Sequence, residues 1–182
     1  MRKLHFLVAT LMESMPLIAK YGLTRTGKLR LVADPLFSEF CDMTITGVGK
    51  ENGRNTAANL KDVVCVNYGF AGSKQHDLGD LICVTKVQGC DLTLPSLGKK
   101  TAEIKCLDEP SQDYIDDVLF DMESQGICEG LHPDLSLVVF KVISDNSKGM
   151  LFHLPGWQNI VHDRIDAMDT LLRNALESGQ LT

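Results

Sequence analysis

The 182-residue sequence has no apolar run approaching the roughly 18–20 residues that a membrane-spanning helix needs. It also has no cluster of Lys and Arg and no long run of like charge, and its net charge is −6. A nucleic-acid surface needs clustered basic side chains to neutralise phosphates. The composition therefore predicts a protein that binds neither a membrane nor a nucleic acid.

Metal-binding spacings are missing as well. None of the six cysteines forms a Cys-x-x-Cys pair, and no Cys/His spacing resembles a zinc site. Cys65 and Cys83 lie in apolar runs and are interpreted as small buried hydrophobes, while scattered free thiols are typical of a reducing compartment. The apolar run in Met1–Ala9 is cut short by Glu13, and no small-residue cleavage site follows it. These features predict a cytoplasmic protein without a metal or organic cofactor.

Hydrophobic periodicity predicts strands that alternate with helices. We expect strands at 4–9, 29–32 (an edge strand), 43–46, 63–66, 80–87, 102–106 and 135–143, and helices at 12–21, 54–60, 116–128 and 157–176. The strands are apolar along their length, which indicates a mostly parallel sheet covered on both faces. The sequence therefore predicts a single α/β domain over residues 1–182.

Two glycine-rich segments, Gly47–Gly53 and Asn67–Ser73, are predicted to be turns that follow strands. Neither matches a dinucleotide or P-loop motif. In open α/β sheets, ligands bind beyond the carboxyl ends of strands, so we expect the site there. The polar strand ends Thr10–Glu13 and Ser144–Asp145 complete this set of candidate positions.

Five short segments, in order, resemble the superfamily that holds purine nucleoside phosphorylases, uridine phosphorylases and methylthioadenosine/S-adenosylhomocysteine nucleosidases. They are VATLMESMPLIAKYGL (8–23), TGVGKENGRNTA (46–57), NYGFAG (67–72) with Gly79-Asp80 after it, Asp121-Met122-Glu123, and Ile143-Ser144-Asp145. The match is closer to the nucleosidases. The resemblance implies a three-layer α/β/α fold with a mixed, mostly parallel sheet. It also implies cleavage of the N-glycosidic bond of a purine nucleoside, with or without a modified 5′ group, and a homodimer or higher homo-oligomer.

The resemblance also assigns catalytic roles. Asp145 matches the general acid that protonates N7 of the leaving purine and so neutralises a poor anionic leaving group. Taken from the residues alone, Asp145 is better explained as a cap or turn residue after a strand. Glu13 lies one residue before the position that matches the family's water-activating glutamate. Ser14 occupies that position itself. One residue turns a helical side chain by about 100°, so the alternative of a solvated first-turn glutamate favoured by the helix dipole stays open.

The remaining positions match substrate contacts. Glu123 matches the carboxylate that grips the ribose hydroxyls, although an exposed helix glutamate is the alternative from the residues alone. Met122 matches the residue that packs against the sugar, and Ser144 belongs to the Ile-Ser-Asp strand end. Phe70, Ala71 and Gly72 match a segment that lies against the base or ribose, where close backbone approach favours glycine. The nucleosidases usually carry a small hydroxyl residue where Phe70 stands.

Two departures keep other functions open. The stretch from Val87 to Asp116 is shorter than in the family and lacks its purine-stacking aromatic motif, so Tyr114 is the nearest substitute. The phosphorylases carry a phosphate-binding arginine after the first strand, whereas this chain has no arginine between Arg2 and Arg25. Arg54, near a glycine turn that opens a helix, is the candidate for that role. The alternatives are therefore a phosphorylase or a non-catalytic nucleoside-binding relative.

Overall fold

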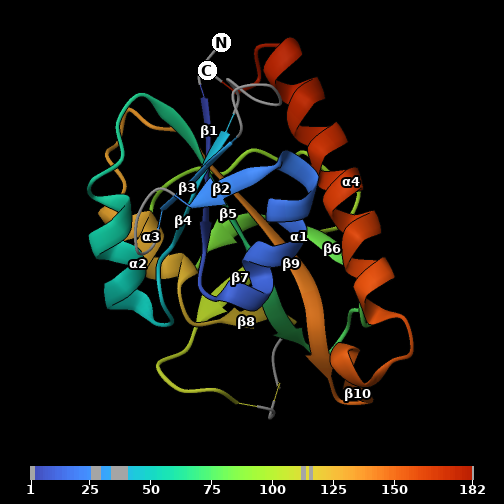
Figure 1. Cartoon of the computed structure of the whole chain (residues 1–182). Coiled ribbons are helices and arrows are strands. Elements are labelled where there is room, and N and C mark those ends of the chain that lie inside the picture. Colours follow the sequence, from blue (N-terminus) through green and yellow to red (C-terminus); the bar gives the residue numbers. More distant parts are fainter. Residues whose placement is uncertain (1–2, 26–29, 34–40, 112–113, 115–116, 182) are drawn as a thin grey trace.

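The computed structural model describes residues 3–25, 30–33, 41–111, 114 and 117–181. Its centre is a ten-stranded sheet in the order β10-β9-β6-β7-β8-β5-β1-β4-β3-β2 (Figure 1). The strands are β1 (Lys3–Val8), β2 (Leu23–Arg25), β3 (Arg30–Ala33), β4 (Cys41–Ile45), β5 (Val63–Ser73), β6 (Leu81–Val87), β7 (Thr101–Cys106), β8 (Leu119–Asp121), β9 (Leu137–Asn146) and β10 (Gly149–Met150).

Helices cover both faces of the sheet (Figure 1). They are α1 (Leu11–Tyr21), α2 (Lys50–Ala57), α3 (Ser124–Gly130) and α4 (Trp157–Glu177), with a short 3₁₀ turn at Leu151–His153. One core cluster joins the sheet to α1 and α4, and a second joins its other face to α2 and α3. This confirms the three-layer α/β/α architecture. Within the described residues, no helix is long and apolar enough to cross a membrane.

The central strands β4, β1, β5 and β9 pair in parallel, so their carboxyl ends meet at one edge of the sheet. β9 also pairs with β6, which leads through β7 and β8 back to β5, so these five strands form a closed circuit of pairings. Antiparallel pairs at β5–β8 and β6–β9 make the sheet mixed. The loops beyond the parallel edge therefore converge on one place, where the candidate site lies.

The long periodic elements are where the sequence predicts them. The helix expected at 157–176 is α4, and its apolar stripe is buried at Val161, Ile165, Met168 and Leu172. The helix expected at 12–21 is α1, which ends at Gly22 in the left-handed conformation. Met12 and Met15, expected on its apolar face, are instead 49% and 62% exposed.

Two predictions fail where glycine was interpreted as a breaker. β5 does not stop at Asn67 but continues to Ser73, because glycine gives room within the strand. A side chain on Gly69 would lie 2.7 Å from Oε1 of Glu13. Helix α2 starts at Lys50 rather than Arg54, since Gly47 and Gly49, both at positive φ, complete the turn early. Gly53 lies inside α2, where a Cβ would approach α3 within 3.0–3.1 Å.

Further corrections concern edges and ends. The helix expected at 116–128 is the short strand β8 followed by α3, because Leu119–Asp121 pairs with both β5 and β7. The strand expected at the sheet edge is β3, but β2 pairs with its outer side and forms the edge instead. β9 runs on to Asn146, where it pairs with β10, instead of ending at Ile143.

The cysteines divide into two groups. Cys90, in the segment after β6, forms a disulfide with Cys128 of α3, so the prediction of free thiols only is wrong for this pair. Cys41, Cys65, Cys83 and Cys106 are buried and form no disulfide. The interpretation of Cys65 and Cys83 as buried hydrophobes is confirmed at 0% and 1% exposure.

Candidate active site

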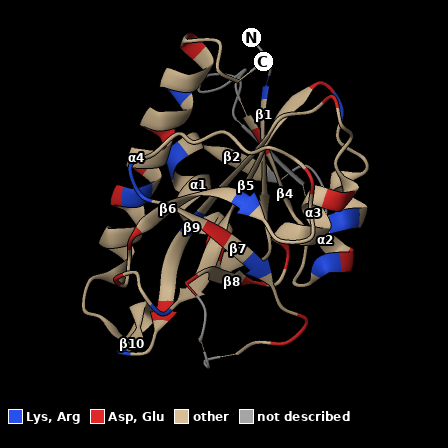
Figure 2. Cartoon of the chain, turned by 180° about the vertical axis from the view of Figure 1, so that it is seen from behind, with Lys and Arg blue, Asp and Glu red and all other residues tan. Residues whose placement is uncertain are grey.

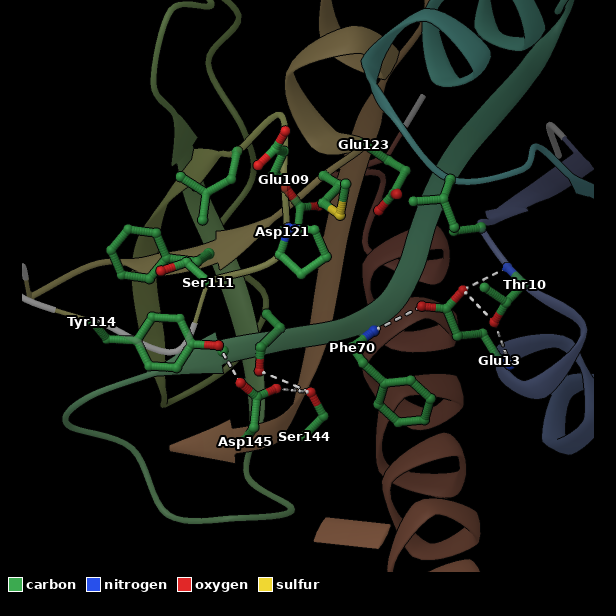
Figure 3. A pocket seen from close by; sticks show the side chains of 18 of the residues that line it. Thr10, Glu13, Phe70, Glu109, Ser111, Tyr114, Asp121, Glu123, Ser144 and Asp145 are labelled. Carbon is green, nitrogen blue, oxygen red and sulfur yellow. Dashed lines mark hydrogen bonds between the residues drawn. The ribbon is translucent and has the colours of Figure 1, made fainter. Parts of the chain in front are cut away.

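A pocket of about 320 Å³ opens at the carboxyl edge of the parallel strands (Figure 3). All eight residues that the sequence predicts for the site line it: Glu13, Phe70, Ala71, Gly72, Met122, Glu123, Ser144 and Asp145. They come from α1, β5, the β8–α3 junction and β9. The wall also includes Leu107, Glu109, Pro110, Ser111 and Tyr114, so the described part of the short stretch before β8 contributes to the pocket.

Glu13 is fixed by two elements at once. Thr10 caps α1, and Oε2 of Glu13 accepts the backbone N–H of Thr10 at 2.8 Å and its hydroxyl at 3.2 Å. Oε1 accepts the N–H of Phe70 on β5 at 3.0 Å. The residue is 6% exposed, which contradicts the alternative of a solvated glutamate. Ser14 is fully buried and donates its hydroxyl to Leu11 O at 2.7 Å, so Glu13 faces the pocket and Ser14 does not.

Glu123 stands at the start of α3 and is 7% exposed, not the exposed helix residue of the alternative interpretation. Its Oε1 accepts the N–H of Gly49 at 2.9 Å, which ties α3 to the turn before α2. The described residues give no hydrogen bond to Oε2, which leaves this oxygen for a ligand. Burial raises the pKa of Glu123, and the nearby carboxylate of Asp121 adds to that effect, against the opposing attraction of Lys141.

A buried ion pair that the sequence reasoning missed lies behind these carboxylates. Nζ of Lys141 on β9 is 2.8 Å from Oδ2 of Asp121, and both side chains are 1% exposed. Burial works against the charged amine, but Asp121, then Glu123 and Glu13, outweigh it and raise the pKa of Lys141. The sequence does indicate a buried charge here, since a lysine interrupts the apolar run LVVFKVIS of the strongest predicted strand.

Asp145 lies near the end of β9, and hydroxyl groups engage both of its oxygens. Ser144 Oγ donates to Oδ1 at 2.5 Å, and the Tyr114 hydroxyl donates to Oδ2. The alternative of a turn cap fails here, because Asn146, and not Asp145, accepts the N–H of Lys148 in the turn that follows. Tyr114 therefore reaches the site through Asp145, a contact that no sequence motif indicated.

The pocket wall carries negative charge. The carboxylates of Glu13, Glu109, Asp121, Glu123 and Asp145 line it, and none of its described lining residues is a Lys or Arg. Arg54, the candidate for phosphate binding, is paired with Glu129 of α3 on the outer surface and does not line the pocket. Figure 2 shows Lys and Arg together with Asp and Glu on the helices α2 and α4. Within the described residues, no group of three or more His, Cys, Asp and Glu is arranged to hold a metal ion.

No protein-family model and no curated protein matches the sequence. Solved structures do match the fold across almost the whole chain. A methylthioadenosine/S-adenosylhomocysteine nucleosidase (MTAN) from Chlamydia trachomatis has a TM-score of 0.72 at 16% identity over 98% of both chains. The 5′-methylthioadenosine/S-adenosylhomocysteine nucleosidase from Helicobacter pylori, solved with butyl-thio-DADMe-Immucillin-A, has a TM-score of 0.74 at 16% identity, over 96% of this chain and 99% of its own.

A futalosine hydrolase mutant from Helicobacter pylori also has a TM-score of 0.74, at 13% identity over 96% of this chain and 100% of its own. The chain thus has the α/β fold of these solved methylthioadenosine/S-adenosylhomocysteine nucleosidases and of this futalosine hydrolase.

Proposed function

We propose that this protein is a nucleosidase that hydrolyses the N-glycosidic bond of a purine nucleoside. The observation that carries the proposal is the convergence of Glu13, Glu123 and Asp145 in one pocket. These residues come from distant parts of the sequence, and the sequence alone predicts a site role for each of them. The pocket volume of about 320 Å³ is in the range of small-molecule sites. The shared fold with solved nucleosidases supports the same function.

Asp145 is proposed as the general acid. When the C1′–N9 bond breaks, its electron pair passes to the purine, and a proton delivered to N7 neutralises the leaving base. The side chain is held at its end of the pocket by Ser144, so its direction is fixed before a ligand binds. Such preorganisation matters because a small displacement of a catalytic group lowers the rate steeply.

Glu123 is proposed to bind the ribose. Because the Gly49 N–H holds Oε1, the position of Oε2 is fixed, and it can accept hydrogen bonds from the ribose hydroxyls. Its negative charge also stabilises the positive charge that develops on the ribosyl ring as the bond breaks. Met122, in the same wall, supplies apolar contact for the sugar.

Glu13 is proposed to activate water. As the water oxygen forms its bond to C1′, the carboxylate accepts a proton, and the products are free base and free ribose. Oε1 and Oε2 are fixed by Phe70 and Thr10, so the carboxylate is oriented toward the pocket. Lys141 offsets part of the repulsion between Glu13, Glu123 and Asp121.

Phosphate is disfavoured as the nucleophile. A phosphate ion beside Glu13 would face a carboxylate with no Lys or Arg among the described lining residues. Two such charges about 4 Å apart repel by roughly 4 kcal/mol at an effective dielectric near 20. Water carries no such penalty, so the charge of the pocket favours hydrolysis over phosphorolysis. The presence of all three carboxylates, Glu13, Glu123 and Asp145, likewise favours an enzyme over a non-catalytic relative. That the protein forms a homodimer or higher homo-oligomer stays a prediction.

The test is to incubate the purified protein with a panel of purine nucleosides, with and without phosphate, and to separate the products by chromatography. The panel should include 5′-modified and unmodified ribosides. The proposal predicts free base and free ribose at a rate that added phosphate does not increase. Ribose 1-phosphate as product would replace the hydrolase by a phosphorylase, and nucleoside binding without any cleavage would replace it by a binding protein.

A further inference from the structure

The hydroxyl of Tyr114 lies where the proposed general acid must meet its substrate. It donates to Oδ2 of Asp145, while Ser144 donates to Oδ1 at 2.5 Å (Figure 3). Burial, together with the hydrogen bond to Asp145, raises the pKa of the Tyr114 phenol, so it keeps its proton at neutral pH. Each oxygen of the carboxyl group thus accepts a hydrogen bond from one of the protein's own hydroxyls before any base arrives.

The strand beneath Tyr114 is shaped to admit it. Gly72 on β5 and Phe120 on β8 are partners in the antiparallel register. A Cβ on Gly72 would collide with the hydroxyl oxygen and the adjacent ring carbon of Tyr114. The Tyr114 ring stacks on Phe120 with centroids 5.1 Å apart and planes 22° apart. The phenol therefore occupies a fitted place over this strand pair.

We propose, on the basis of the nucleosidase function above, that the Tyr114 hydroxyl and the purine base compete for Asp145, so that Tyr114 sets the affinity of the site for the base. N7 of the base and the Tyr114 hydroxyl both require the same carboxyl group. Both also require the surface over Gly72, a residue that the sequence resemblance places against the base or ribose. A base that binds must break the Tyr114–Asp145 hydrogen bond, and this cost lowers the affinity of the site for the base.

The decisive variant is Tyr114→Phe, which keeps the ring and its stacking on Phe120 but removes the competing hydroxyl. Hydrogen bonds to charged groups contribute measurably to stability even after exchange with water. We expect adenine, measured by titration calorimetry, to bind about tenfold more tightly to Tyr114→Phe than to wild type. In cleavage assays, KM should fall in the variant without a rise in kcat.

The matched control is Tyr21→Phe. Tyr21 is a buried tyrosine that, like Tyr114, donates its hydroxyl to an aspartate, here Asp169 at 2.9 Å, and it does not line the pocket. This variant should leave adenine affinity unchanged. In an Asp145→Ala background, Tyr114→Phe should have a much smaller effect, because the shared partner is gone.

A spectroscopic readout reports on the competition directly. The chain has only three tyrosines, so ¹³C labels on the phenol carbons give three signals that the Phe variants assign. Adenine should shift the Tyr114 signal and leave the Tyr21 signal in place. If wild type cleaves nucleosides but Tyr114→Phe binds adenine equally or more weakly, the competition is wrong while the nucleosidase function stands. If neither wild type nor Tyr114→Phe binds a purine or cleaves a nucleoside, the proposed function fails and the competition with it.

Discussion

Glu13→Gln is the substitution that separates the chemical role of Glu13 from its structural role. In the wild type, the two carboxylate oxygens accept the N–H groups of Thr10 and Phe70 and the Thr10 hydroxyl. A glutamine has one oxygen and one NH₂ group, so it can accept at one end only. At least one buried backbone N–H then loses its acceptor, which costs about 1–3 kcal/mol.

The catalytic loss should be larger than this structural loss. A general base typically contributes about 10²–10⁴-fold to the rate, and the amide cannot accept the proton of the attacking water. A destabilisation of about 1–3 kcal/mol leaves a domain of ordinary stability, about 5–15 kcal/mol, folded. Urea denaturation gives the first quantity, and release of free base from a cleaved nucleoside gives the second.

Ser14→Ala is the control for Glu13→Gln. Among the described residues its hydroxyl bonds only to Leu11 O within the same helix, and it does not line the pocket. We expect Ser14→Ala to lose about 1 kcal/mol of unfolding free energy with little change in turnover. Near wild-type turnover in folded Glu13→Gln, or an equal loss of turnover in Ser14→Ala, would refute the assignment of Glu13 as the base.

Two further substitutions test charged groups, one in the wall of the pocket and one behind it. Glu123→Gln should weaken binding of ribosides more than of 2′-deoxyribosides, by about 1.5–3 kcal/mol for a lost hydrogen bond to a charged group; equal losses for both sugars would remove Glu123 from the ribose site. Because the folded protein raises the pKa of Glu123, its ionisation costs stability as pH rises above the ordinary glutamate value of about 4.3. Glu123→Gln should therefore be the more stable protein at pH 7 and lose that advantage below about pH 4, as urea titrations at the two pH values would show. Lys141→Met should lower the unfolding free energy by about 3–5 kcal/mol, since it leaves the carboxylate of Asp121 buried without its partner; unchanged stability would contradict the ion pair.

The sequence was most informative where the chemistry lies at strand ends. Glu13 and Asp145 could be expected at the site because parallel strands deliver their carboxyl ends to one edge, whatever the details of the loops. Glu123 follows β8, which runs antiparallel to β5, and only its match to the family's motif predicted it. The layers and the last helix followed from periodicity alone. The single-residue displacement of Glu13 could not be resolved from sequence, since it depends on the capping by Thr10 and the contact with Phe70 across 57 residues.

What could not be predicted depends on contacts between distant segments. The sequence around Gly69 predicts a turn, but Gly69 lies inside the continuous strand β5, where its missing side chain makes room for Glu13. Cys90 and Cys128 carry no spacing motif, and only the packing of α3 brings them together. Tyr114 lies 31 residues from Asp145, in a stretch without periodicity, so local patterns gave no indication of their hydrogen bond.

The measurement that tests the central claim most directly compares wild type with Asp145→Asn in single-turnover cleavage of a purine nucleoside, alongside the nucleoside dissociation constant of each protein. The account predicts that Asp145→Asn stays folded and binds the nucleoside but cleaves it about 10²–10⁴-fold more slowly, because the amide cannot protonate N7. An Asp145→Asn protein that cleaves at close to the wild-type rate would show that Asp145 is not the general acid of this pocket.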